Sequence, residues 1–147
     1  DVTLSRNLET LNRGPFANCD ALTEILIPKS LNYGGDSAYD SNTGYYTDYI
    51  GAFSNCDNLK KVTFEEGIAE IPYALFAECT GLEEITIPDT VKIIETGAFD
   101  DAVNLKKVVL SNSLTTINDY AFRNCDSLAS ISIPCKSVVC VFNIANL

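Results

Sequence analysis

The chain has 147 residues, 46% of them hydrophobic, and a formal net charge of −10 at pH 7. The hydrophobic content is too high for a disordered chain. The acidic balance argues against binding to nucleic acid, which needs a surplus of Lys and Arg, and against binding to anionic membrane surfaces. The sequence also contains no His, which removes the usual base of a nucleophilic Ser or Cys and the commonest metal ligand.

One pattern recurs through the chain. A Phe is followed by a small residue at the third position, a Leu at the sixth, and large apolar residues at the ninth and eleventh. The Phe residues are Phe16, Phe53, Phe76, Phe99 and Phe122. The last three steps are 23 residues long, and the first is 37, one period plus 14. Repeats of this period indicate a stacked solenoid, because each turn buries its apolar face only against its neighbours.

The period predicts one strand in each turn. Alternating apolar residues place these strands at 22–27, 59–64, 82–87, 105–110 and 128–133. Ahead of them, Val2–Leu4 aligns with the strand at 105–110 and predicts the strand of a truncated first turn. Because a turn is already under way there, we expect the chain to be a piece of something longer.

Other parts of each turn also follow the pattern. Two apolar anchors, eight and five residues earlier, precede four of the five Phe residues, as Ile68 and Ile71 precede Phe76. The Phe-x-x-Cys segment is predicted to form a single helical turn, which would put Phe and Cys on one side. After Pro134 the period fails, and we interpret residues 135–147 as an atypical terminal turn or a cut edge.

Four of the six Cys residues share one position in the repeat. They are Cys19, Cys56, Cys79 and Cys125. Ala102 fills the same position in the remaining turn, which indicates a small, buried, apolar slot. We expect free thiols there, because side chains in register point in parallel; disulfides between turns are the alternative. A local bridge between Cys135 and Cys140 stays open.

The extra residues lie at about 32–46. The stretch contains no Leu, Val, Ile or Phe, so it cannot belong to the core, and residues 33–49 hold five of the seven Tyr. A long loop in a compact repeat is usually functional or disordered, and Tyr mixed with Gly, Ser, Asn and Asp is typical of binding loops. The alternative is a solvated loop packed on the solenoid flank. The candidate binding residues are Tyr33, Asp36, Tyr39, Asp40, Tyr45, Tyr46 and Tyr49.

The insertion also carries a weak metal signal. Residues 40–44 resemble the start of a calcium-binding loop, but the bidentate Glu that such a loop needs is missing. We therefore predict no metal and no cofactor; a weakly held ion at Asp36, Asp40 and Asp48 is the alternative.

Charges alternate from turn to turn at one outward strand position, two residues after each Leu. The four charged residues are Glu24, Lys61, Glu84 and Lys107. We interpret them first as a charge ladder that sets the strand register, and alternatively as a mixed-charge face for a protein partner. Adjacent carboxylates such as Glu83 and Glu84 do not indicate a glycosidase, because neighbours on a strand point to opposite faces. We predict no enzyme.

The repeat resembles the BspA-like, or TpLRR-type, class of leucine-rich repeats over about residues 2–134. The matching residues of one turn are Ile87, Pro88, Val91, Ile94, Ala98, Phe99, Leu105, Val108 and Leu110. The resemblance implies a right-handed β/α leucine-rich-repeat solenoid of about five to six 23-residue turns, with a concave parallel β-sheet, in a single domain spanning 1–147. It also implies a surface or secreted protein of a host-associated bacterium, and the family has no shared catalytic residues.

We therefore expect a cell-surface or secreted adhesion module. Its partner would be a host protein, such as a matrix protein, or a glycan. We expect a monomer that does not insert into the membrane and binds no nucleic acid. The competing hypotheses are a spacer or stalk unit of a larger surface protein, and an intracellular scaffold, which the free thiols would permit.

Overall fold

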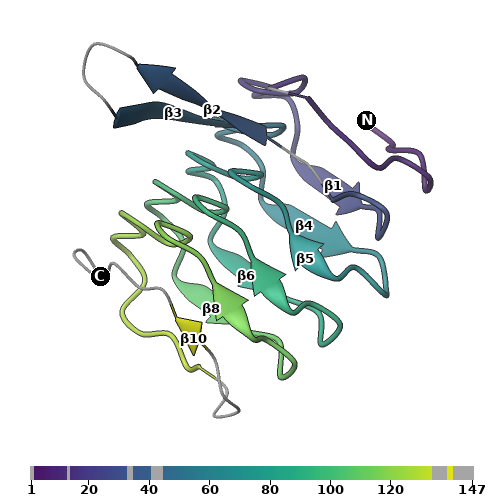
Figure 1. Cartoon of the computed structure of the whole chain (residues 1–147). Coiled ribbons are helices and arrows are strands. Elements are labelled where there is room, and N and C mark those ends of the chain that lie inside the picture. Colours follow the sequence, from purple (N-terminus) through teal and green to yellow (C-terminus); the bar gives the residue numbers. More distant parts are fainter. Residues whose placement is uncertain (1, 13, 33–34, 41–44, 134–138, 141–147) are drawn as a thin grey trace.

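The computed structural model describes residues 2–12, 14–32, 35–40, 45–133 and 139–140, with the backbone alone for 35–40, 45–49 and 139–140. The described chain winds into stacked coils with short strands at corresponding places (Figure 1). No described residue lies in a helix. The β/α part of the prediction is therefore wrong for this part of the chain, although the repeated parallel strands of a solenoid are present.

The first row of strands consists of β1 (Glu24–Ile27), β4 (Lys61–Phe64), β6 (Glu84–Thr86) and β8 (Lys107–Val109). β1 pairs with β4 and β6 pairs with β8, both parallel and at the predicted register. The strands predicted at Val2–Leu4 and at 128–133 do not form. Both lie in terminal turns, where a segment has a neighbouring turn on one side only and its pairing is least supported.

A second row of strands was not predicted. It consists of β5 (Glu70–Ile71), β7 (Ile93–Ile94), β9 (Thr116–Ile117) and β10 (Val139–Cys140), which form one parallel sheet in the order β10-β9-β7-β5. The sequence pattern shows the apolar anchors of this row, among them Ile71 and Ile94, but not their pairing. Val139 pairs with Thr116, 23 residues earlier, so β10 keeps the 23-residue period. The prediction that the period fails after Pro134 is therefore wrong at β10.

Hydrogen bonds between coils also replace the predicted helical turns. The amide of Phe53 donates to the carbonyl of Leu75 at 3.2 Å, and the amide of Asn55 donates to Ala77 at 2.9 Å. Asn55 has a φ of 58°, which an α-helix does not contain. The corresponding residues Asn18 and Asn124 have φ near 59° and 56°. The amides therefore point along the stack, and these turns form a third row of hydrogen bonds between coils beside the two rows of strands.

The core is a column of aromatic rings flanked by thiols. The five Phe rings stack with successive centroid distances of 5.3, 5.8, 5.7 and 5.3 Å. Cys56, Cys79 and Cys125 are buried and free, and Cys19 is free and half-buried, as predicted. The Cys79 thiol donates to the carbonyl of Phe53 in the preceding turn at 3.1 Å. Cys135 and the side chain of Cys140 lie outside the described residues.

The insertion forms a β-hairpin in place of the predicted loop. β2 (Gly35–Asp40) pairs antiparallel with β3 (Tyr45–Gly51) in a sheet of its own. Tyr and Thr are common in strands, and residues 41–44 between them are typical of a turn. The sequence therefore contained a hairpin signal, which the absence of aliphatic residues concealed.

Candidate functional site

The hairpin lies across the upper ends of the coils in Figure 1. Its register brings Tyr39 opposite Tyr46 and Asp40 opposite Tyr45, with an irregularity between Ala38 and Tyr39. These four candidate residues are therefore cross-strand neighbours. Two more candidates also lie in the hairpin, Asp36 opposite Ile50 and Tyr49 opposite Ser37. Tyr33, the last candidate of the insertion, lies outside the described residues.

The exposed side of the first row is the second candidate surface, which we call the strand face. It consists of the outward residues of β1, β4, β6 and β8, namely Glu24, Leu26, Lys61, Thr63, Glu84, Thr86, Lys107 and Val109, together with their charged neighbours Lys60, Glu83 and Lys106. The register aligns Glu24 with Lys61 and Glu84 with Lys107. The structure thus brings the predicted charged residues together as two cross-strand pairs in four successive turns, which we call the charged column.

Ion pairs on the strand face support the charge-ladder interpretation. Lys61 Nζ lies 3.3 Å from Glu24 Oε2, and Lys106 Nζ lies 2.8 Å from Glu83 Oε2. The hydrogen bond and charge of Lys106 hold the pKa of Glu83 below its ordinary value. Because these side chains are well exposed to solvent, each pair contributes little stability. The ladder therefore favours the correct strand register, while its charged side chains stay exposed to solvent.

The candidate residues predicted from the sequence do not cover the whole strand face. Lys60, Glu83 and Lys106, beside the predicted column, line a hollow together with Gly81, Glu84 and Lys107. Gly81 marks a close approach of two turns, because a Cβ there would lie 2.3 Å from the carbonyl oxygen of Asp57. Lys60, Glu83 and Lys106 directly precede β4, β6 and β8, and their sequence signal was the same alternation one position earlier. The expectation that Glu83 and Glu84 point to opposite faces is wrong, because both line this hollow and Glu83 lies outside the strand.

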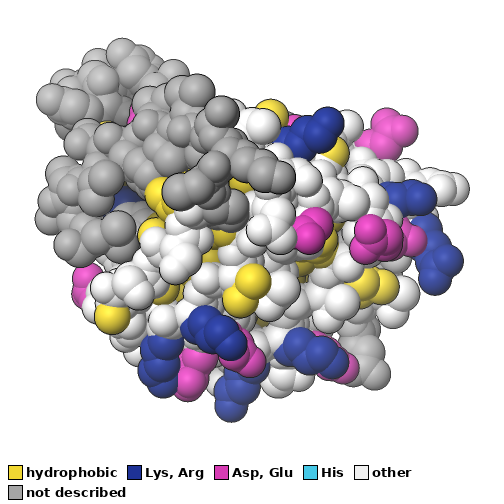
Figure 2. Space-filling view, turned by 90° about the horizontal axis from the view of Figure 1, so that it is seen from below, with side chains coloured by type: hydrophobic (Ala, Val, Ile, Leu, Met, Phe, Trp, Pro, Cys, Tyr) yellow, Lys and Arg dark blue, Asp and Glu magenta, His cyan; other side chains and the backbone are white. Residues whose placement is uncertain are grey.

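Two apolar side chains lie on the strand face. Leu26 is 50% exposed and Val109 is 43% exposed, and Thr63 and Thr86 occupy the same position in the two turns between them. Figure 2 shows basic and acidic side chains lying next to one another, and no large patch of one sign. The face therefore combines a mixed-charge column with a neutral column.

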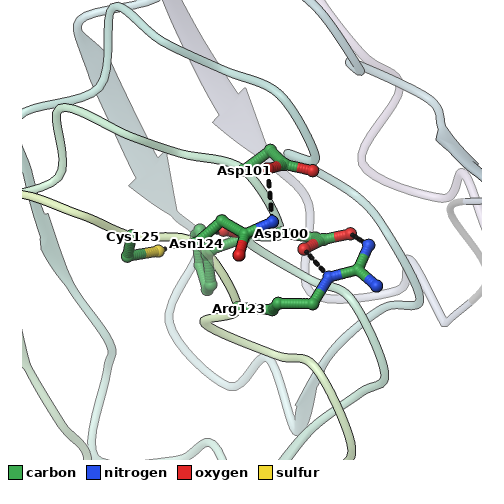
Figure 3. A network of polar contacts seen from close by, with 6 residues as sticks. Asp100, Asp101, Arg123, Asn124 and Cys125 are labelled. Atoms are coloured by element: carbon green, nitrogen blue, oxygen red, sulfur yellow. Dashed lines mark hydrogen bonds and ion pairs between the residues drawn. The ribbon is translucent and has the colours of Figure 1, made fainter. Parts of the chain in front are cut away.

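A partly buried polar network lies in the turns around Phe99 and Phe122, with Asp100 as its buried member (Figure 3). Arg123 Nε donates to Asp100 Oδ1 at 2.7 Å, and its Nη2 donates to Oδ2. Burial raises the pKa of Asp100, and the bonds from Arg123 lower it by less. Arg123 also lies 4.9 Å from the centre of the Tyr120 ring. These charges are satisfied within the fold, so the network is structural.

The described residues contain neither a cluster of metal-binding side chains nor a membrane-spanning helix. No group of three or more acidic or Cys side chains lies close enough together to hold a metal ion in this part of the chain. No described segment forms a helix with the length and hydrophobicity needed to cross a bilayer.

Stacked coils of about 23 residues, in which a Leu is followed by apolar residues three and five positions later, define a leucine-rich repeat protein. A sequence model of the BspA type leucine-rich repeat region matches residues 1–49 and 48–141, with 6 copies. The chain belongs to the BspA-type leucine-rich repeat family. No functionally curated protein matches it.

Solved structures have the same fold. A leucine-rich repeat protein from Eubacterium ventriosum is 30% identical with a TM-score of 0.72, over 95% of this chain and 34% of that one. A leucine rich cell surface protein from Faecalibacterium prausnitzii is 24% identical with a TM-score of 0.68, over 98% and 32%. A leucine-rich repeat protein from Bacteroides ovatus is 26% identical with a TM-score of 0.56, over 83% and 34%. The chain thus spans about a third of the length of each.

Proposed function

We propose that the chain is a non-enzymatic binding module of a cell-surface or secreted protein, and that it adheres to a host protein or a glycan through the β2–β3 hairpin. The family membership supports a repeat module, and one fold neighbour is itself described as a cell surface protein. Three features stay predictions: that the coil is right-handed, that the first row lies on its concave side, and that the protein belongs to a host-associated bacterium.

The observation that carries the proposal is the separateness of the hairpin. β2 and β3 pair only with each other, whereas the other strands pair from turn to turn within the parallel rows. The solenoid does not need the hairpin for its ladders, yet the insertion contains most of the Tyr residues of the chain. Tyr supplies large contact area at a low cost in conformational entropy, and its ring stacks on sugar rings and apolar surfaces.

The register of the coils indicates how to remove the hairpin cleanly. Asn32 donates its amide to the carbonyl of Glu9 as Lys92 donates to Ala69, so Asn32 still belongs to a regular turn. Thr47 stands six residues before Phe53, as Glu70 stands six before Phe76. Deleting residues 33–46 therefore joins two positions that are adjacent in the other turns and reduces the 37-residue step to 23.

The test is a binding screen against matrix proteins and glycans, with the intact chain beside the deletion variant. We expect a ligand that binds the intact chain and loses most of its affinity for the variant, while far-UV circular dichroism shows that the variant is folded. A milder variant replaces Tyr39, Tyr45 and Tyr46 by Ser and keeps the chain length. A ligand that binds all variants equally would move the site to the strand face. No ligand at all would favour a spacer of a longer surface protein.

A further inference from the structure

We propose that the strand face binds the strand face of a second copy of this chain. The order of the side chains along the strand face indicates this partner, because the order is self-complementary. Along the four turns the charged column is Glu24, Lys61, Glu84 and Lys107. Reversed, the order becomes Lys, Glu, Lys, Glu, so every acidic residue meets a basic one.

A two-fold axis parallel to the strands and passing between β4 and β6 produces this reversal. It turns the second copy face to face with the first and keeps each column opposite its own copy. Glu24 then faces Lys107 of the second copy, and Lys61 faces Glu84. A two-fold axis along the stack would place each turn opposite itself and would not pair opposite charges in this way.

The neighbouring columns obey the same rule. Lys60 meets Glu83 across the axis, because they lie in the two central turns at the same strand position. In the neutral column, Leu26 meets Val109, and Thr63 meets Thr86. The two exposed large apolar side chains of the described residues are therefore buried against each other at both ends of the interface.

The charges that the fold leaves over are the ones that this arrangement uses. Lys61 and Lys106 form ion pairs within the chain, and the charge of Lys60 helps to lower the pKa of Glu83. Within the described chain Glu84 and Lys107 form no ion pair. In the pair of copies each gains a partner. The face is nearly balanced in charge, with four Lys against three Glu, although the whole chain carries −10. Acidic chains thus meet where their mutual repulsion is smallest.

The interface is small and its affinity is correspondingly low. Four short strands spaced about 4.8 Å apart cover much less than the roughly 800 Å² per partner of a stable dimer. Association is therefore weak and weakened by salt, and dilute chains are monomers, in keeping with the sequence expectation. Many copies displayed together on one surface would strengthen it through avidity.

The test uses charge reversal in two variants that repair each other. Lys61→Glu places acid against Glu84 twice across the axis, and Glu84→Lys places base against Lys61 twice. Each should weaken self-association by at least about tenfold, since like charges in contact are costly. A mixture of the two variants, in which opposite charges meet again, should associate about as well as the wild type, and so should the double variant.

The measurement is sedimentation velocity on the intact chain, from about 10 µM to 1 mM at low and high salt. Lys92→Glu and Glu66→Lys make the same changes of net charge at exposed positions away from the strand face and should leave self-association unchanged. The inference is overturned if the wild type stays monomeric at the highest concentration, if the controls weaken association equally, or if the mixture fails to recover it. None of these outcomes bears on the ligand screen, which tests the hairpin.

Discussion

Replacing Phe76 by Ala should destabilise the chain far more than the same change at Phe16. The Phe76 ring is fully buried and stacks on Phe53 at 5.8 Å and on Phe99 at 5.7 Å. It also meets the edge of the Phe64 ring at 6.3 Å. Phe16 stands at the end of the column, is half-buried, and stacks on Phe53 at 5.3 Å.

The two losses of stability differ because Phe76→Ala leaves an enclosed cavity in the core, whereas Phe16→Ala removes a ring that solvent already reaches. Truncating a fully buried Phe costs about 3–5 kcal/mol, which includes the cavity that its neighbours cannot fill. At Phe16 water reaches part of the ring already, so the cost falls to about 1–2 kcal/mol of lost burial. We therefore expect the free energies of unfolding of the two variants to differ by about 1–4 kcal/mol.

The assay is urea unfolding followed by far-UV circular dichroism, because the chain has no Trp to report by fluorescence. With a slope of about 2 kcal/mol per M, Phe76→Ala should lower the midpoint by roughly 2 M and Phe16→Ala by less than about 1 M. Equal slopes would establish that both variants unfold the same structure. Equal losses at the two sites would refute the argument that closed stacking in the column determines the cost.

Three further predictions rest on other contacts. Gly51→Ala should strongly destabilise the chain in urea unfolding, because its Cβ would lie 1.7 Å from a backbone oxygen. Gly67→Ala should cost about 1 kcal/mol, because its Cβ meets only a Lys side chain at 3.5 Å and the strain comes from its φ of 94°. Equal losses of stability in the two variants would contradict this prediction. Arg123→Ala should cost about 3–5 kcal/mol because it leaves Asp100 buried and unpaired. Changing both residues to Ala should cost less than the single change in a double-mutant cycle, and a larger cost would contradict the role of burial. Burial raises the pKa of Cys125 from 9.0 to about 12, so the unfolded chain loses this proton at a lower pH than the folded chain. Stability should therefore fall between these pH values, by about 1.4 kcal/mol per pH unit for this thiol. Cys125→Ala should reduce the slope of that fall between pH 9 and 10, and an unchanged slope would contradict the prediction.

The sequence predicted the core because the core repeats. Each slot of the coil recurs four or five times, so residues such as Cys79 and Ala102 identify one small buried position together. The pairing of β5, β7 and β9 was missed for a related reason. Two-residue strands are too short to show alternation, and their hydrogen bonds depend on the neighbouring turns.

The candidate sites were predictable to different degrees. The charged column followed from register alone, since parallel strands one period apart place equivalent residues side by side, as Glu24 and Lys61 are. The hairpin occurs once, so no repeat could identify it, and its strands contain no regular aliphatic alternation. The pair of Asp100 and Arg123 could have been predicted in the same way, because each residue directly follows the repeat Phe and they lie 23 residues apart. It was missed because that position is Ala in two other turns and shows no charge alternation.

The three rows of hydrogen bonds between coils also determine how the chain would respond to pulling. A load applied to its two ends acts along the stack and peels one terminal coil at a time, because each coil is held only by its neighbour. Each released turn of 23 residues yields roughly 80 Å of extended chain. A surface protein built from such coils would lengthen in steps under flow and rewind when the flow stops, since no turn needs a distant part of the chain to reform its contacts.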